Sequence, residues 1–126
     1  MSQALRDELE ARVSKLNKEW PEHDANAIHR EFFSPQAWIA GEGMPAAAQD
    51  AAGVVATLQH MFEQAPHVKV EVVSASVFDS AISSWLHWMI TDAEGTVQAT
   101  MRSLTLWERL EGRLVIACDS FSAGEL

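Results

Sequence analysis

Alternating apolar and polar residues mark the start of the strand-rich second half of the chain. The alternation runs from Val68 to Val72 and then changes phase, continuing from Val73 to Val77. Period-two alternation is typical of a half-buried strand, and a change of phase is what one inserted residue produces. The pattern therefore predicts a strand that bends at a β-bulge near Val72 and Val73.

Three longer runs rich in strand-forming residues follow. Short polar segments separate them, and both segments end in glycine, as tight turns between antiparallel strands often do. The pattern predicts an antiparallel meander whose last three strands cover residues 81–91, 96–110 and 113–122.

The first half of the chain has helical periodicity instead. Apolar residues recur at spacings of three and four from Leu5 to Trp20, Pro21 ends that pattern, and Asp24 stands where a helix N-cap belongs. The predicted helices cover residues 3–19, 25–33 and 46–64, with a short strand at residues 37–40.

These elements predict an α+β fold in one domain, residues 1–126, with three N-terminal helices packed on one face of a strongly curved antiparallel sheet. A chain of 126 residues that is 48% hydrophobic has the size and composition for one such core. A bent sheet wrapped over a long helix leaves a conical pocket, and such concavities are the usual ligand sites.

The turn at residues 92–95 decides which side chains enter this cone. A type I turn followed by a bulged glycine points Trp85 and His87 inward, whereas a two-residue loop shifts the pairing by one and points Leu86 and Trp88 inward. We adopt the first register as the working prediction.

The turn at residues 111–112 has the same ambiguity, and we predict a two-residue loop that pairs Thr105 with Cys118. The inward face then mixes aromatic and small polar groups, and its predicted pocket residues are Trp38, His60, Trp85, His87, Met101, Ser103, Thr105, Cys118 and Ser120. The opposite face, which would also carry Asp119, is too apolar to face water, so a homodimer is expected. Its predicted interface residues are Leu86, Trp88, Leu104, Leu106 and Phe121.

Composition narrows the function further. A net charge of -9 argues against nucleic acid and anionic membrane surfaces as partners. Cys118 is the only cysteine, which excludes an intrachain disulfide and a multi-cysteine zinc site. No apolar leader or run of about 20 apolar residues is visible, so a cytoplasmic protein is expected.

Little in the sequence indicates a specific chemistry. There is no phosphate loop, nucleophile elbow, zinc spacing or dinucleotide fingerprint, and the five histidines are scattered, so no cofactor or metal is expected. His87 is the candidate acid or base, although a histidine between two tryptophans is more often a packed or interface residue.

The order of the elements and the closing segment from Thr105 to Ser122 resemble the nuclear transport factor 2-like superfamily, and its SnoaL-like and ketosteroid-isomerase-like members most. In that family a turn glycine is followed by Trp-x-Ile and then His-Asp-His-x-Ser. Here Leu114 replaces the tryptophan, and Cys118 and Ser120 replace the two histidines. The resemblance implies a cystatin-like cone and a homodimer.

Enzymes of this superfamily hold an enolate with a carboxylate base and a tyrosine or protonated aspartate. This chain has no tyrosine, and Ser34-Pro35-Gln36 stands where an acid often follows the second helix. We therefore expect a protein that binds a small apolar or aromatic molecule. The alternatives are an isomerase, cyclase or dehydratase using His87, and a homodimeric interaction module whose cone is packed solid.

Overall fold

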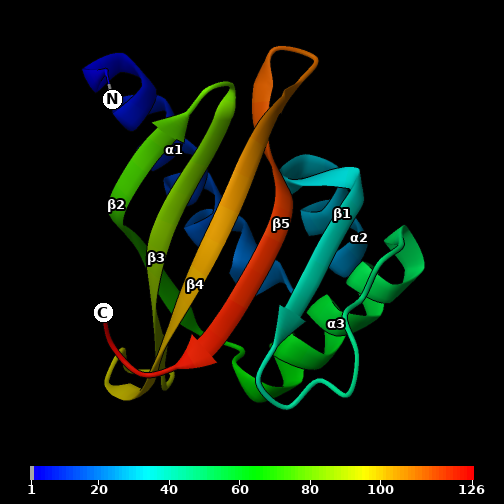
Figure 1. Cartoon of the computed structure of the whole chain (residues 1–126). Coiled ribbons are helices and arrows are strands. Elements are labelled where there is room, and N and C mark those ends of the chain that lie inside the picture. The colour runs from blue at the N-terminus through cyan, green and yellow to red at the C-terminus, as the bar shows by residue number, and fades with distance from the viewer. Residues whose placement is uncertain (1) are drawn as a thin grey trace.

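A curved five-stranded sheet forms one wall of the molecule, in the order β1-β5-β4-β3-β2 (Figure 1). The computed structural model describes residues 2–126. β1 runs parallel to β5, and the other neighbours are antiparallel. The strands are β1 (Phe33–Gly41), β2 (Val68–Phe78), β3 (Ala81–Thr91), β4 (Val97–Leu110) and β5 (Arg113–Ala123).

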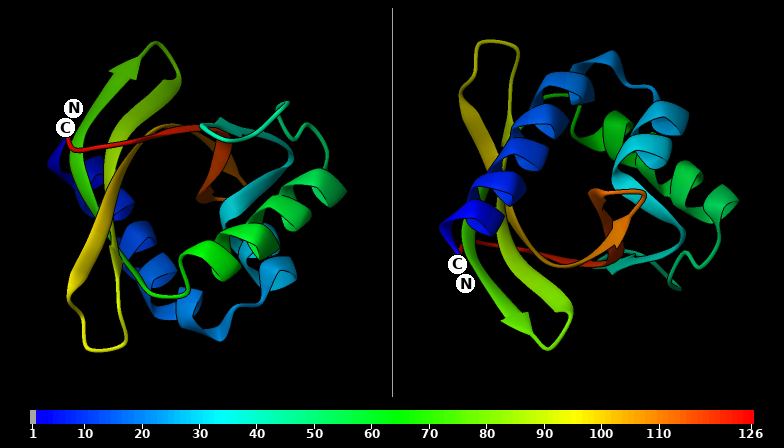
Figure 2. Two further views of the ribbon diagram at one scale, coloured as in Figure 1. Left: turned by 90° about the horizontal axis from the view of Figure 1, so that it is seen from below. Right: turned by 90° about the horizontal axis from the view of Figure 1, so that it is seen from above.

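The helices all lie on the concave side of this sheet, called the inner face below (Figure 2). They are α1 (Gln3–Glu19), a 3-10 turn η1 (Trp20–Glu22), α2 (Ala25–Phe32) and α3 (Ala51–Gln64). The expected α+β architecture is present, but two details of it are wrong. Only two of the α-helices precede the sheet, since α3 lies between β1 and β2, and the parallel β1 makes the sheet mixed.

Side-chain caps begin all three helices. Ser2 accepts from the backbone N–H of Leu5, and Asp24 caps α2 as predicted by accepting from the N–H of Ala27. Asp50 does the same for α3 through the N–H of Gly53, at 2.7 Å. Because an aspartate at the N-cap satisfies the first free N–H groups, α3 begins at residue 51 and not at 46.

β1 is also longer than predicted and runs through Pro35. A proline lacks the N–H that a central strand needs, so it is confined to edges and irregular positions. β1 is an edge strand, and its pairing with β5 shifts between Phe33 and Trp38. Because β1 has a neighbouring strand on one side only, Pro35 fits in it although its nitrogen cannot donate a hydrogen bond.

Three β-bulges set which residues face the helices. In β2 the partners pass from Val72↔Leu86 to Ser74↔Trp85, so Val73 is the extra residue and the predicted bulge is confirmed. The same kind of shift makes Gln98 extra in β4 and Ala117 extra in β5. These last two bulges were not predicted from the sequence.

The unpredicted bulges reverse the predicted faces. The pairing at the tip of the β3–β4 hairpin is Thr91↔Val97, in the predicted register, but beyond Gln98 it becomes Leu86↔Ser103. Leu86 and Trp88 consequently lie on the inner face, where Leu86 is fully buried. Ala117 likewise changes the partner of Thr105 from Cys118 to Asp119.

The core fills the space between the inner face and the helices. α1 contributes Leu9, Val13 and Leu16, and Trp20 follows them at the end of the helix. Trp20 packs edge-on against Phe62, with ring centroids 4.6 Å apart, and against Trp88 at 5.5 Å. No helix within residues 2–126 is long and apolar enough to cross a membrane.

Candidate functional site

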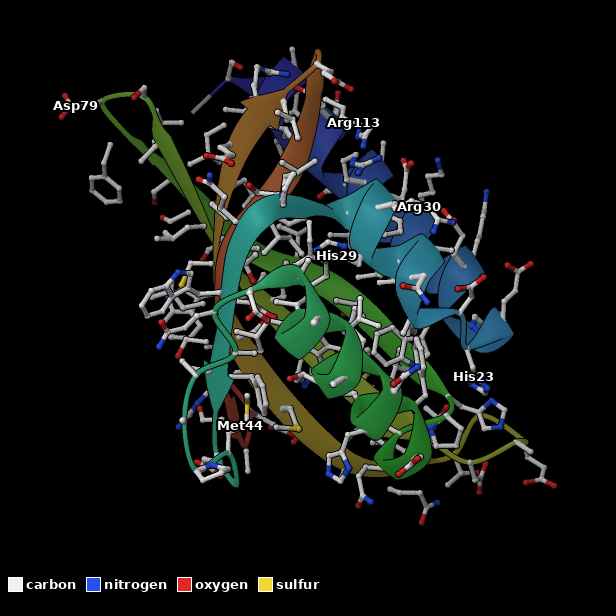
Figure 3. The ribbon with its side chains drawn as sticks, turned by 90° about the vertical axis from the view of Figure 1, so that its right-hand side faces the viewer. His23, His29, Arg30, Met44, Asp79 and Arg113 are labelled. Carbon is white, nitrogen blue, oxygen red and sulfur yellow. The ribbon has the colours of Figure 1, made fainter. Side chains whose placement is uncertain are left out.

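A cavity of about 310 Å³ remains between α3, the loop after β1 and the inner face of the sheet. Met44 belongs to this loop and lies beside α3 (Figure 3). Most of the wall is apolar, and its residues are Trp20, Glu42, Gly43, Met44, Thr57, His60, Met61, Gln64, Ala65, Val68, Trp88, Ile90, Met101, Asp119 and Phe121. The chain thus has a concave apolar site of the kind that takes small molecules.

Asp119 is the buried acid of this cavity. The other ionisable side chains in its wall, Glu42 and His60, are exposed and form part of the rim, whereas Asp119 is only 5% exposed. The extra residue Ala117 turns Asp119 inward, opposite Thr105 on β4. The same strand then places Phe121 in the wall.

A chain of buried hydrogen bonds holds Asp119 from behind. The hydroxyl of Thr105 donates to Asp119 Oδ1 at 2.8 Å, and Thr105 Oγ1 lies 3.3 Å from the hydroxyl oxygen of Ser103. Trp88 Nε1 donates to Ser103 Oγ at 2.9 Å. Trp88, Ser103, Thr105 and Asp119 are called the polar chain below.

Burial dominates the electrostatics of Asp119. Removing a carboxylate from water disfavours its charged form, and this raises the pKa of Asp119 to about 6. Hydrogen bonds from Thr105 and, less strongly, from Ser103 stabilise the carboxylate and oppose the rise. Asp119 therefore exists in both protonation states near neutral pH.

The indole N–H groups of the two wall tryptophans are already used. Trp20 Nε1 donates to the backbone oxygen of Ala65 at 2.9 Å, and Trp88 Nε1 donates within the polar chain. The hydroxyl of Thr57 donates to the backbone oxygen of Gly53. A ligand inside the cavity thus meets the apolar rings of these tryptophans and the carboxyl group of Asp119.

The predicted pocket residues divide into two groups. His60 and Met101 line the cavity, and Ser103 and Thr105 lie just behind its wall in the polar chain. The other predicted pocket residues do not line it, because they lie on the outer face of the sheet or at its β1 edge. They are Trp38, Trp85, His87, Cys118 and Ser120.

His87 is therefore misplaced as a candidate acid or base for this cavity. The bulge at Gln98 pairs it with Arg102 and turns both side chains away from the helices. Its Nε2 atom is buried and has no hydrogen-bond partner within residues 2–126. A proton transfer inside the cavity must use another group.

Three of the predicted interface residues also need correction. Leu86 and Trp88 are buried against the helices, and Phe121 lines the cavity, so none of them is available to a second subunit. Leu104 and Leu106 do lie on the outer face, where they are 37% and 39% exposed.

Two comparisons by sequence found nothing: no protein-family model matches the chain, and no curated protein matches it. Solved structures do match. A domain of unknown function with a cystatin-like fold from Nostoc punctiforme PCC 73102 is similar with a TM-score of 0.78 and 11% identity, over 100% of this chain and 81% of that one. An NTF-2 like protein of unknown function from Shewanella oneidensis MR-1 is similar with a TM-score of 0.73 and 16% identity, over 93% of this chain and 98% of that one.

The chain has the cystatin-like fold of nuclear transport factor 2-like proteins. A third similar structure, from Catenulispora acidiphila, was determined in complex with S-DNPA. It has a TM-score of 0.75 and 19% identity, over 97% of this chain and 95% of that one. At these identities the likeness establishes the fold and not the activity.

Asp119 was not predicted as a site residue, although one signal in the sequence pointed to it. In the closing segment that resembles the nuclear transport factor 2-like pattern, Asp119 stands between Cys118 and Ser120, at the position of the aspartate between the two histidines of that pattern. The predicted register placed it on the outer face, and the bulge at Ala117 reverses that. Within residues 2–126, no three His, Cys, Asp or Glu side chains form a group that could hold a metal ion.

Proposed function

We propose that this protein binds a small, uncharged, mostly apolar molecule in the cavity, with one polar group of the ligand turned toward Asp119. The observation that carries the proposal is a buried carboxyl group in the wall of an open apolar cavity of about 310 Å³. A protein of the same fold holds S-DNPA, which gives the proposal further support. A cone packed solid would have favoured the interaction module instead.

Filling the cavity tests this proposal. Titration of the protein with 1-tetralone, a neutral bicyclic ketone, should quench the fluorescence of Trp20 and Trp88, since both rings line the cavity. Met101→Trp should weaken binding at least tenfold by occupying the space, whereas Val97→Trp, at an exposed site on the same strand, should leave it unchanged. Equal binding by both variants would place the ligand elsewhere.

The second candidate is an enzyme that moves a proton to or from a ligand carbon, with Asp119 as the acid or base. The raised pKa of Asp119, about 6, favours this candidate, because a general acid or base works best when its pKa lies near the operating pH. Asp119 replaces His87 in this role.

Exchange of carbon-bound hydrogen separates the enzyme from the binding protein. If Asp119 acts as a base, the α-protons of bound 1-tetralone should exchange with D₂O faster than in buffer, as followed by proton NMR. Asp119→Asn should lose this acceleration and keep the fluorescence quenching. Exchange at the buffer rate with wild-type protein would leave binding as the function and exclude proton transfer to this ketone.

We further propose that the outer face of the sheet pairs with a second copy of the chain. Leu104 pairs with Trp85, and Leu106 pairs with Cys118, which in turn pairs with Trp38, so these side chains form one continuous patch. Trp38 and Trp85 are 48% and 38% exposed. Exposed apolar patches of this kind often mark interfaces, and a two-fold contact needs only one self-complementary patch.

A further inference from the structure

Gly41, the last residue of β1, is a glycine that its backbone conformation does not require. The glycines with a left-handed φ are Gly43, Gly95, Gly112 and Gly124, which all lie outside the helices and strands, and Gly41 is not one of them. A glycine in a strand often marks a place where another group approaches the backbone closely. The neighbours of Gly41 should therefore explain why it has no side chain.

The ring of Phe121 occupies the space that a side chain at residue 41 would need. β1 and β5 lie side by side, and Gly41 pairs with Phe121 (Figure 1). A methyl group on Gly41 would lie 2.5, 2.5 and 2.6 Å from the ring atoms Cε2, Cζ and Cδ1 of Phe121. Cδ1 and Cε2 stand opposite each other in the ring, so the methyl group would meet the face of the ring. The ring therefore lies flat against the bare backbone of Gly41.

Hydrogen bonds hold the backbone around Gly41 in place. The backbone N–H of Glu42 donates to the backbone oxygen of Phe121 at 3.2 Å, and the N–H of Met44 donates to the backbone oxygen of Gly41 at 3.1 Å. Moving Gly41 away from the ring would break these bonds together with the pairing of β1 on β5. A side chain at residue 41 would therefore displace the ring, which belongs to a rotatable side chain, and not the strand.

Phe121 forms the cavity wall at this point, and Gly41 lies behind it. Phe121 lines the cavity, whereas Gly41 does not. On β4, Ser103 is the partner of Phe121 and Met101 is its diagonal neighbour, and Met101 is another residue of the wall. The missing side chain of Gly41 thus sets how far back the ring stands from the cavity.

A side chain at residue 41 would move the ring of Phe121 into the cavity. Phenylalanine has three staggered χ1 positions, and the one adopted here places the ring over β1. The other two direct the ring toward β4, where Met101 lines the cavity, or away from the sheet toward α3. Since the cavity lies between the inner face and α3, either position takes space from a ligand.

The size of the cavity gives this space a chemical meaning. Its volume of about 310 Å³ is roughly twice that of a ~150 Å³ protein cavity that binds one benzene. We infer that Gly41 is a specificity-determining residue: by letting the ring of Phe121 lie back on β1, it leaves space for a ligand of two fused rings. This inference rests on the proposed function, because it names the size class of the ligand in the same cavity.

The first test follows the ring of Phe121 in the free protein by methyl NMR of the methionines. In Gly41→Ala the ring current should shift the methyl signal of Met101, while Met89, on the outer face of β3, should keep its signal. The same variant should lower the urea midpoint of unfolding by roughly 0.5–1 M, because it overpacks the site. In a Phe121→Ala background, Gly41→Ala should leave the midpoint unchanged.

Two results of the first test would overturn the inference. One is an unchanged Met101 signal in Gly41→Ala, which would mean that the ring does not enter the cavity. The other is an equal loss of stability in both backgrounds, which would mean that the ring is not what excludes a side chain at residue 41. Because neither measurement needs a ligand, this test is independent of the proposed function.

The second test measures ligand size by equilibrium dialysis with acetophenone and 2-acetylnaphthalene, which differ by one fused ring. Gly41→Ala should weaken binding of 2-acetylnaphthalene about tenfold and binding of acetophenone less than about threefold. Adding Phe121→Ala to this variant should restore binding of the larger ketone.

Equal weakening of both ketones in Gly41→Ala would refute the size selection and leave the proposed function standing. An unchanged affinity for 2-acetylnaphthalene in that variant would refute it as well. A wild-type protein that binds neither ketone would refute the size selection together with the proposed function.

Discussion

At the scale of single residues, Asp119 gives the clearest thermodynamic prediction. Its pKa is raised in the folded protein, so the folded state holds the proton more tightly than the unfolded state. The free energy of unfolding from this group should therefore be highest below about pH 4 and fall as the pH rises toward 6. The shift from 3.8 to about 6 sets an upper limit of ~3 kcal/mol.

Comparison with Asp119→Asn isolates this effect in urea unfolding experiments between pH 4 and pH 7. His29 gives the opposite slope, because burial lowers its pKa and its stabilisation is lost as the pH falls. That contribution is common to both proteins and cancels in the difference. If the stability difference between wild type and variant is constant over this range, Asp119 is not perturbed by burial.

At the scale of secondary structure, Arg12 joins α1, α2 and β5. Its guanidinium donates to the backbone oxygen of Leu114 at 2.9 Å, to Glu31 Oε1 at 2.7 Å and to the backbone oxygen of Glu31. It also lies 4.8 Å from the ring centroid of Phe32. Hydrogen bonds donated by Lys15 and Arg12 to the Glu31 carboxylate lower the pKa of that carboxyl to about 2.

Replacing Arg12 by lysine tests whether this three-way contact holds the helices to the sheet. An ammonium group is a point donor and cannot serve three acceptors in a planar fork, so Arg12→Lys should cost about 2 kcal/mol. Arg6→Lys is the control: Arg6 pairs with Glu10 on its own helix and makes only one long contact with the sheet, 3.3 Å to the backbone oxygen of Val72, so its replacement should cost under about 1 kcal/mol. Similar losses of unfolding free energy in both variants would contradict the assigned role.

The same scale explains which features could be predicted from the sequence. Helix α1 was predictable because its apolar residues form one clear stripe, and the bulge at Val73 was predictable because the apolar alternation visibly changes phase there. From Trp85 to Trp88, and again from Leu104 to Trp107, both phases carry apolar residues. A one-residue bulge at Gln98 or Ala117 then exchanges two faces of similar composition, and nothing local in the sequence reveals it.

Asp119 was misassigned for this reason, together with His87 and three of the predicted interface residues. His60 and Met101 were placed correctly on the cavity wall, His60 through its position in a helix and Met101 on a face that also holds Ser103 and Thr105. Which residues of β4 and β5 pair depends on the position of the β-bulge, that is, on which residue of the two strands is left without a partner. That choice is made by packing against the helices, which distant parts of the chain supply.

At the scale of the whole molecule, the curved sheet has two different apolar surfaces, and only one of them is covered by helices (Figure 2). The inner face closes over the core and leaves the cavity beside Asp119. The outer face leaves Trp38, Trp85, Leu104 and Leu106 exposed on neighbouring strands. If a second copy covers that face, the cavity of each subunit stays open at its own rim, because the rim lies on the side of α3.

The proposed dimer predicts a mass in sedimentation velocity of twice the 13.9 kDa of one chain. Leu106→Asp should yield the single-chain mass, because a dimer would bury two unpaired carboxylates in an apolar contact. Ala56→Asp places the same charge on the exposed side of α3 and should remain dimeric. A wild-type protein that sediments as one chain would contradict the pairing, and so would a Leu106→Asp variant that stays folded and dimeric.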